Sequence, residues 1–323
     1  MPMPRTLTLA VMLALPFGIA GCQRDATSSP PVAALQLQIE AGPRYSDWSA
    51  PTNLGPPVNT ALTEQGPSVS KDGLSLYFHC VGCPGNAGNS DIFVAQRASL
   101  DAPWGTPQRL GPNVNSAGLD QAPRLSRDGH RLFFGSDRSG GAGGQDLYVS
   151  RRRDKRDDFG WEPAVNLGAV NTSIDEVTPD PFEDEVTGGN ALYYANGPIG
   201  SGGLDIYVST QLEDGNYGPG VPVAELNTSA LDRQPAISRD GLQIYLASDR
   251  PGTFGALDLW VASRATTSDP WSSPVNLGSV INSAVIDARP ASSFDGTELY
   301  FQSPRQGNFD LYVSTRTKLT GPQ

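Results

Sequence analysis

One unit of sequence recurs five times along this chain, and this repeat constrains the fold more than any other feature. Its first marker is a proline at intervals of 56, 56, 56 and 55 residues: Pro67, Pro123, Pro179, Pro235 and Pro290. A second marker, an asparagine, repeats at the same intervals: Asn59, Asn115, Asn171, Asn227 and Asn282. A unit of this length has too little sequence for a core of its own, so neighbouring units must stack to bury their apolar faces.

Each unit contains four short apolar runs. In the second unit they cover residues 122–126, 131–135 and 146–150 and the stretch around 163–167. The runs are rich in Leu, Val, Tyr and Phe and are separated by Asp-Gly pairs or glycine-rich turns, a pattern typical of antiparallel strands. The 36 glycines and 28 prolines of the chain suit many such turns. Four strands repeated five times predict an all-β fold, a five-bladed β-propeller of four-stranded antiparallel blades.

A third marker, Trp-x-x-Pro, predicts how the ring closes. It follows the third strand of a unit at Trp104 and Trp271. At Trp161, and at Tyr217 in the corresponding place of the remaining unit, the proline comes one position earlier. The first copy, at Trp48, precedes the whole array, whereas the last unit ends shortly after its third strand. We therefore expect the N-terminal segment to supply the outer strand of the last blade and to cover an open sheet edge.

The beginning of the chain has the features of an export signal. Arg5 is followed by an apolar run over residues 7–19, too short to span a membrane, and then by small residues before Cys22. This order resembles the bacterial lipobox, in which the cysteine is acylated; an ordinary secretory signal is the alternative. The expected organisation is a lipoprotein signal peptide (1–21), the lipidated Cys22 with a flexible tether (22–44), the propeller (45–318) and a tail (319–323). Gln23 resembles the residue that directs lipoproteins to the outer membrane, so the expected location is the cell envelope, anchored by lipid in the outer membrane.

Three motifs of the repeat are Pro-x-Leu-Ser-x-Asp-Gly, Ser-Asp-Arg at 136–138 and 248–250, and Asp-Leu-Tyr-Val at 146–149 and 310–313. Through them the chain resembles a known family, the TolB-type, WD-repeat-like propeller repeats. The resemblance covers residues 45 to about 318 and implies a propeller of the cell envelope. TolB itself has six blades and an additional domain, whereas five repeats are counted here.

Charge and missing motifs exclude several functions. The net charge is −11 and the pI is near 4.6, so a basic surface for nucleic acid is absent. The chain has two histidines and no Gly-x-Ser-x-Gly, phosphate-binding loop or His-Glu-x-x-His motif. We expect no cofactor, no nucleic-acid partner and a monomer, and assign no catalytic residue.

Polar residues converge on one mouth of the predicted channel. An acid follows each marker asparagine by five residues, and we expect a ring of these carboxylates: Glu64, Asp120, Glu176, Asp232 and Asp287. Loops that carry Asp137, Arg138, Asp249, Arg250 and Arg305 open on the same face and form the candidate binding face. The ring has two interpretations. Its members either stabilise turns and pair with arginines, or they bind a divalent cation through oxygen ligands.

Two units depart from the pattern. The first has Cys80 and Cys83, which form a disulfide, remain as free thiols, or take part in metal or redox chemistry. The third carries an acidic group that we expect in a solvated loop on the opposite face: Asp180, Glu183, Asp184 and Glu185.

Two functions follow as hypotheses. The first is a non-catalytic envelope lipoprotein whose propeller face binds a protein or an envelope polymer, such as a polysaccharide- or peptidoglycan-associated partner. The alternative is a carbohydrate-active enzyme, similar to glycoside hydrolases, that uses carboxylates at the channel mouth.

Overall fold

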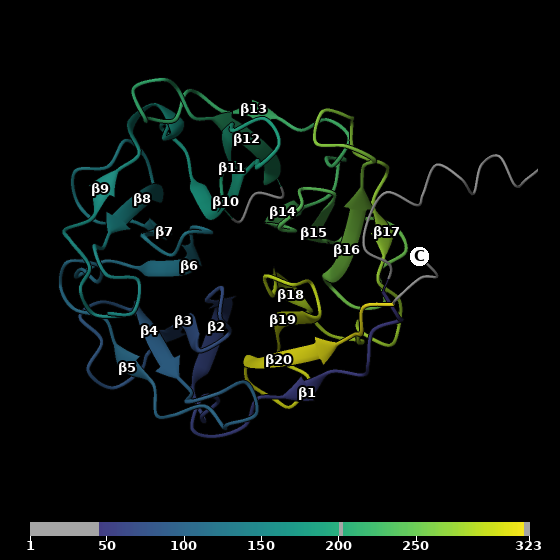
Figure 1. Ribbon diagram of the computed structural model, residues 1–323, viewed down its shortest axis with the longest axis horizontal. Coiled ribbons are helices and arrows are strands. Elements are labelled where there is room, and N and C mark those ends of the chain that lie inside the picture. The colour runs from purple at the N-terminus through teal and green to yellow at the C-terminus, as the bar shows by residue number, and fades with distance from the viewer. Residues whose placement is uncertain (1–44, 200–202, 320–323) are drawn as a thin grey trace, which may run out of the picture. The chain divides into compact units, whose positions relative to one another are not determined.

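The fold is a ring of five antiparallel sheets, each of four strands (Figure 1). This computed structural model describes residues 45–199 and 203–319. The predicted five-bladed, all-β propeller is confirmed. The signal peptide, Cys22 and the tether lie outside the described residues, and those predictions remain open. No helix within the described ranges has the length and apolar character needed to cross a bilayer.

The strands follow one another outward within each blade. Blade 1 consists of β2 (Thr63–Val69), β3 (Ser75–Val81), β4 (Ser90–Gln96) and β5 (Gln108–Arg109). Blade 2 consists of β6 (Asp120–Leu125), β7 (Arg131–Ser136), β8 (Asp146–Arg151) and β9 (Val165–Asn166). A short helix, η1 (Gly168–Val170), precedes blade 3, which consists of β10 (Glu176–Glu183), β11 (Asn190–Asn196), β12 (Asp205–Thr210) and β13 (Val221–Pro222). Blade 4 consists of β14 (Asp232–Ile237), β15 (Gln243–Ser248), β16 (Asp258–Ser263) and β17 (Val275–Asn276). Blade 5 combines β18 (Ala288–Ser292), β19 (Glu298–Ser303) and β20 (Asp310–Thr315) with the N-terminal strand β1 (Thr52–Asn53).

The N-terminal strand closes the ring as predicted. Thr52 and Asn53 of β1 pair with Val313 and Tyr312 of β20, and the Leu54 amide donates to the carbonyl of Leu311. The marker Asn59 donates to the Leu311 carbonyl and accepts from its amide. The first and last blades are therefore joined by backbone pairing and by a side chain that caps it.

The apolar core lies between the blades. Five clusters of buried side chains each combine residues from two successive blades, such as Phe78 of blade 1 with Tyr300 of blade 5. The tryptophan marker belongs to these layers: Trp161 meets Tyr77 of the preceding blade edge to face, with ring centroids 6.2 Å apart. Tyr217 meets Phe133 in the same way at 6.1 Å, so it does replace the missing tryptophan. Stacking blades thus bury both faces of every sheet.

Each inner strand contains a β-bulge that the sequence analysis did not predict. The register shifts two residues after each ring carboxylate, and the residue there has a positive φ of 52–62° in all five blades: Gly66, Ala122, Thr178, Gln234 and Arg289. The marker proline is the next residue. Because proline has no backbone N–H to donate, it fits a position where the hydrogen bonds between the inner strand and the second strand are interrupted. Four of these residues are not glycine, which costs about 1 kcal/mol or more each in backbone strain. The bulge turns this position toward the channel.

The five inner strands define two mouths of the channel. Strands β2, β6, β10, β14 and β18 surround the centre of the ring (Figure 1). We call the mouth where these strands begin the first mouth. The second mouth is where they end, next to the hairpins that lead to the second strand of each blade.

Candidate functional site

The residues of the predicted carboxylate ring lie at the start of the inner strands, at the first mouth, but their side chains are buried against their own turns. All five are at most 1% exposed. Each accepts from the backbone N–H and the hydroxyl of a Ser or Thr four residues earlier, as Asp232 does from Thr228 at 2.5 and 2.7 Å. Within the described residues, no hydrogen bond or ion pair joins one ring carboxylate to another. The ring residues therefore stabilise the turns that lead into the inner strands.

The choice between Asp and Glu in the ring follows the presence of an arginine. Asp120 pairs with Arg138 of its own blade at 2.6 Å, and Asp232 and Asp287 pair in the same way with Arg250 and Arg305. In blades 1 and 3 that arginine is missing, and the longer Glu64 and Glu176 stand in the ring. Burial raises the pKa of both glutamates.

The loops of the candidate binding face have contacts of their own. Asp137 and Asp249 accept from the amides of Leu119 and Leu231 at 2.6 and 2.7 Å, which fixes these loops to the start of the inner strand. Their arginines are the partners of the ring carboxylates. The five ring carboxylates and the five loop residues of the candidate binding face thus contact one another only locally, within each blade. That this face binds a ligand remains a prediction.

The first blade carries a disulfide between Cys80 and Cys83, whose Cα atoms are 5.7 Å apart. Glu64 lies close enough to both sulfurs to suggest a metal site, yet sulfurs bonded to each other are not thiolate ligands. The bridge occupies the place where blades 2 and 4 have Ser-Asp-Arg. Beside it, His79 is buried under the channel wall, and burial together with Arg289 holds its pKa well below the usual value.

We expect millimolar Ca²⁺ or Mg²⁺ to leave the thermal unfolding temperature unchanged. The ring carboxylates already accept hydrogen bonds from their turns, and three of them are paired with arginines, so their oxygens do not form an open set of ligands. Differential scanning fluorimetry with and without the metals, at matched ionic strength, measures this. A rise in Tm with Ca²⁺ that the sodium control lacks would restore the cation interpretation of the ring.

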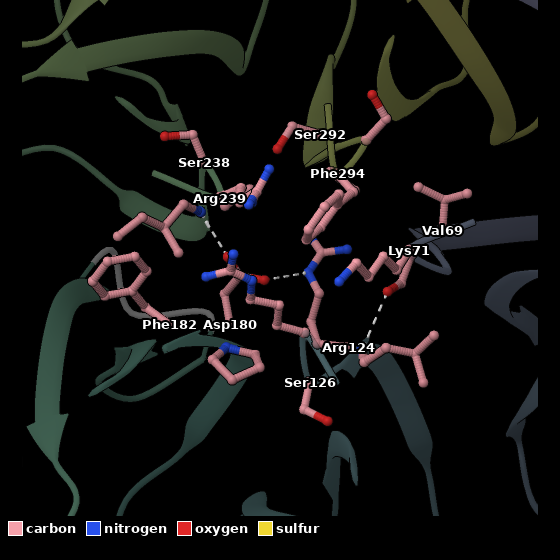
Figure 2. A pocket seen from close by; sticks show the side chains of 18 of the residues that line it. Val69, Lys71, Arg124, Ser126, Asp180, Phe182, Ser238, Arg239, Ser292 and Phe294 are labelled. Carbon is pink, nitrogen blue, oxygen red and sulfur yellow. Dashed lines mark hydrogen bonds and ion pairs between the residues drawn. The ribbon is translucent and has the colours of Figure 1, made fainter. Parts of the chain in front are cut away.

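A pocket of about 110 Å³ opens at the second mouth, and residues from all five inner strands line it. Figure 2 shows the Asp180 carboxylate in its middle, joined to Arg124 and to the backbone of β14. Asp180 was expected in a solvated loop. That prediction is wrong, because Asp180 and Glu183 belong to β10 and Asp180 is buried, while only Asp184 and Glu185 of the acidic group lie in the loop that follows.

Asp180 and Arg124 link all five blades. Arg124 of blade 2 contacts Asp180 of blade 3 at 3.1 Å and donates to the carbonyls of Pro67 and Pro290 in blades 1 and 5. Asp180 accepts from the Ile237 amide of blade 4 at 2.6 Å. Burial raises the pKa of Asp180 to about 6, although Arg124 and the Ile237 amide act in the opposite direction. The pocket thus contains a carboxyl group that exchanges its proton near neutral pH.

Cations and one aromatic ring form the rim of this pocket. The Lys71 ammonium lies 4.4 Å and the Arg239 guanidinium 4.3 Å from the centre of the Phe294 ring, with Arg127 at 5.4 Å. Glu183 lines the same pocket and pairs with Arg131 at 2.9 Å. The rim therefore offers positive charge and an apolar face next to two carboxyl groups.

The sequence contained one signal for this site. At the fourth position after the ring acid, the five units have Ser68, Arg124, Asp180, Ala236 and Ala291, so the repeat is broken by an opposite-charge pair. The sequence analysis placed the acidic group on the face opposite the ring, but the spacing did not reveal the bulge that precedes Asp180 in β10.

Comparisons with known proteins support the fold. The structure resembles the catalytic domain of a GH62 α-L-arabinofuranosidase from Coprinopsis cinerea (TM-score 0.56, 13% identity, 85% of this chain and 98% of that one). It also resembles an α-L-arabinofuranosidase from Lactobacillus brevis (TM-score 0.55, 15% identity, 80% and 92%) and a thermostable family-43 glycoside hydrolase (TM-score 0.54, 11% identity, 83% and 93%). No protein-family model matches the chain, and no curated protein matches it. Likeness at these identities shows the fold alone.

These neighbours correct two expectations. The TolB-type resemblance predicted a propeller, which is confirmed, but the structures found are glycoside hydrolases and not TolB-type proteins. The hypothesis of a non-catalytic envelope binder was wrong as the first choice, since enzymes that act on glycosides share this five-bladed architecture. A rigid ring that displays loops suits a binding protein and an enzyme equally. The regularity of the repeat therefore does not distinguish between these two functions.

Proposed function

We propose that this protein is a glycoside hydrolase-like enzyme that cleaves a glycan in the second-mouth pocket, with Asp180 as the proton donor. The observation that carries the proposal is a buried carboxyl group, with its pKa raised to about 6, inside an axial pocket. Glycoside cleavage needs a carboxylic acid that is still protonated near neutral pH to protonate the leaving oxygen. The likeness to arabinofuranosidases supports the reaction class.

The other residues of the pocket have consistent roles. Arg124 and the Ile237 amide hold the Asp180 carboxyl in one orientation, which a proton donor requires. Glu183, held by Arg131, is the second carboxylate, for attack at the sugar or activation of water.

The test is hydrolysis by the purified protein of a panel of aryl glycosides and polysaccharides, starting with α-L-arabinofuranosides and arabinan. Release of reducing sugar or aryl alcohol above a heat-treated control is expected for at least one member. A panel that also includes galactans, xylans and uronic-acid polymers, with no turnover of any member, contradicts the proposal.

The rate of this reaction should decline as pH rises above about 6. A general acid acts in its protonated form, which is dominant below the pKa of Asp180 and is lost above it. We expect kcat to fall about tenfold per pH unit on the alkaline side. The measurement is a pH–rate profile from pH 4 to 9 on the best substrate. A rate that stays constant up to pH 8 would assign the proton donor to another group.

We further propose that the protein is anchored in the cell envelope through Cys22, where an envelope polysaccharide is its partner. The order of Arg5, the apolar run and Cys22 supports this. Replacing Cys22 with Ser should abolish incorporation of radiolabelled palmitate and shift the protein from membranes to the soluble fraction. Unchanged labelling in the variant would refute anchoring at this residue.

A further inference from the structure

Three arginines lie in the interior of the channel, and one carboxylate faces them. Arg124, Arg233 and Arg289 come from β6, β14 and β18, and Arg124 is fully engaged with Asp180 and two carbonyls. Among the described residues, neither Arg233 nor Arg289 has an ion-pair partner within 4.0 Å, although the charge of Asp249 acts on Arg233. Of these three arginines, Arg124 alone has a carboxylate ion-pair partner among the described residues.

Polar atoms in this region also lack hydrogen-bond partners. The Nε and Nη1 atoms of Arg289 are buried and unpaired, while its Nη2 donates to Gln121 at 3.1 Å. The Arg233 Nε and the hydroxyl of Thr178 are buried and unpaired as well. Burying a cation without a partner is strongly unfavourable, so an unfilled arrangement of this kind destabilises the fold.

The electrostatics agree with the geometry. Burial, and then the like charges of Arg233 and Arg124, lower the pKa of Arg289 to about 9, which still leaves it charged at neutral pH. His79 stays neutral and adds no charge of either sign. Protein groups alone thus leave a surplus of positive charge at the centre of the ring.

A small cavity lies beside these groups. Its volume is about 10 Å³, and its lining includes Arg124, Thr178, Gln234 and Arg289. That is room for about one water molecule or a single atom-sized ion. A carboxylate, phosphate or sugar is too large, and a water molecule would satisfy hydrogen bonds without balancing charge.

We propose that this cavity is a binding site for one monatomic anion, a halide such as chloride, held by the free guanidinium N–H groups of Arg289 and the hydroxyl of Thr178. The charges of Arg233 and Arg124 add long-range attraction from the channel walls. Bulges in β10 and β18 give Thr178 and Arg289 their positive φ at this level of the channel. The cavity adjoins the proposed glycan pocket, because Arg124 lines both, but the proposal does not depend on whether the protein cleaves glycans.

The first test compares the thermal stability of the full chain in sodium chloride, sodium bromide and sodium methanesulfonate at equal ionic strength. A halide near saturation should raise Tm by about 5 °C relative to the larger anion. The Arg289→Met variant should lose this difference, whereas Arg153→Met, which removes an exposed arginine, should retain it. Equal Tm values for the wild-type protein in all three salts would overturn the proposal.

The second test needs no variant, so it is decisive even where Arg289→Met does not fold. Crystals of the wild-type protein grown in sodium bromide should give an anomalous difference peak next to the Arg289 guanidinium and the Thr178 hydroxyl. Density without an anomalous signal at that position would identify a water molecule and refute the halide site.

Discussion

Replacing Asp180 with Asn is expected to reduce kcat for the best glycoside substrate by about 10²–10⁴-fold, because the amide cannot supply the proton to the leaving oxygen. The alkaline limb of the pH–rate profile should disappear in the residual activity, since its titrating group is gone. Steady-state kinetics on the panel substrate measure both effects. A variant with wild-type kcat would remove Asp180 from the reaction.

Stability must be separated from chemistry in this experiment. The Asp180→Asn substitution leaves the Arg124 guanidinium without its carboxylate partner, so some loss of Tm accompanies the change. The matched control is Asp214→Asn, the same change at an exposed loop of the same blade, which should leave kcat and Tm unchanged. Rates are compared at a temperature at which both variants are folded, as near-ultraviolet circular dichroism reports.

Removing the N-terminal strand should destabilise the whole ring. A chain that begins at Gly55 loses β1 and the backbone bonds from Ser46, Ser49 and Leu54 to blade 5. It also loses Trp48, which packs on Tyr245 and under Arg316. We assign about 1 kcal/mol to each of these three backbone hydrogen bonds and about 2 kcal/mol to burial of the indole. The free energy of unfolding should therefore fall by about 5 kcal/mol, which lowers Tm by about 10 °C.

The control for this truncation is a chain that begins at Tyr45 and keeps the strand. It should unfold at the temperature of the full-length protein, because it keeps every pairing of the described N-terminal segment, from Tyr45 with Lys318 onward. Trp48→Ala should have an intermediate effect. If the chain from Gly55 were as stable as the chain from Tyr45, β1 would not be what holds the first and last blades together.

The blade count, the strand order and the closure at Trp48 could all be predicted from spacing. Each depends on markers that repeat every 55 or 56 residues and on turn residues that act within a few positions, such as Gly129 with its φ of 76° in the hairpin after β6. Such effects are local, so one copy of the unit predicts the others. The disulfide was among three alternatives for Cys80 and Cys83, and the structure contains it.

The orientation of side chains in the channel could not be predicted. The position of the ring carboxylates along the chain does not tell whether each side chain points to the axis or back to its own turn. The hydroxyl four residues earlier, as in Thr228 and Asp232, decides that. Likewise, Asp180 belongs to an acidic run in the sequence and becomes buried only because β10 extends along the axis.

The sequence by itself determined the architecture of this protein, because strand, turn and blade-stacking preferences repeat within every unit and act over short distances. Only the tertiary structure decided where chemistry can occur. Arg124, Asp180 and Arg289 are separated by 56 to 165 positions in the chain, and they meet because five bulged strands converge on one axis. Charge and burial at that axis depend on all five blades at once, so no single repeat carries the information.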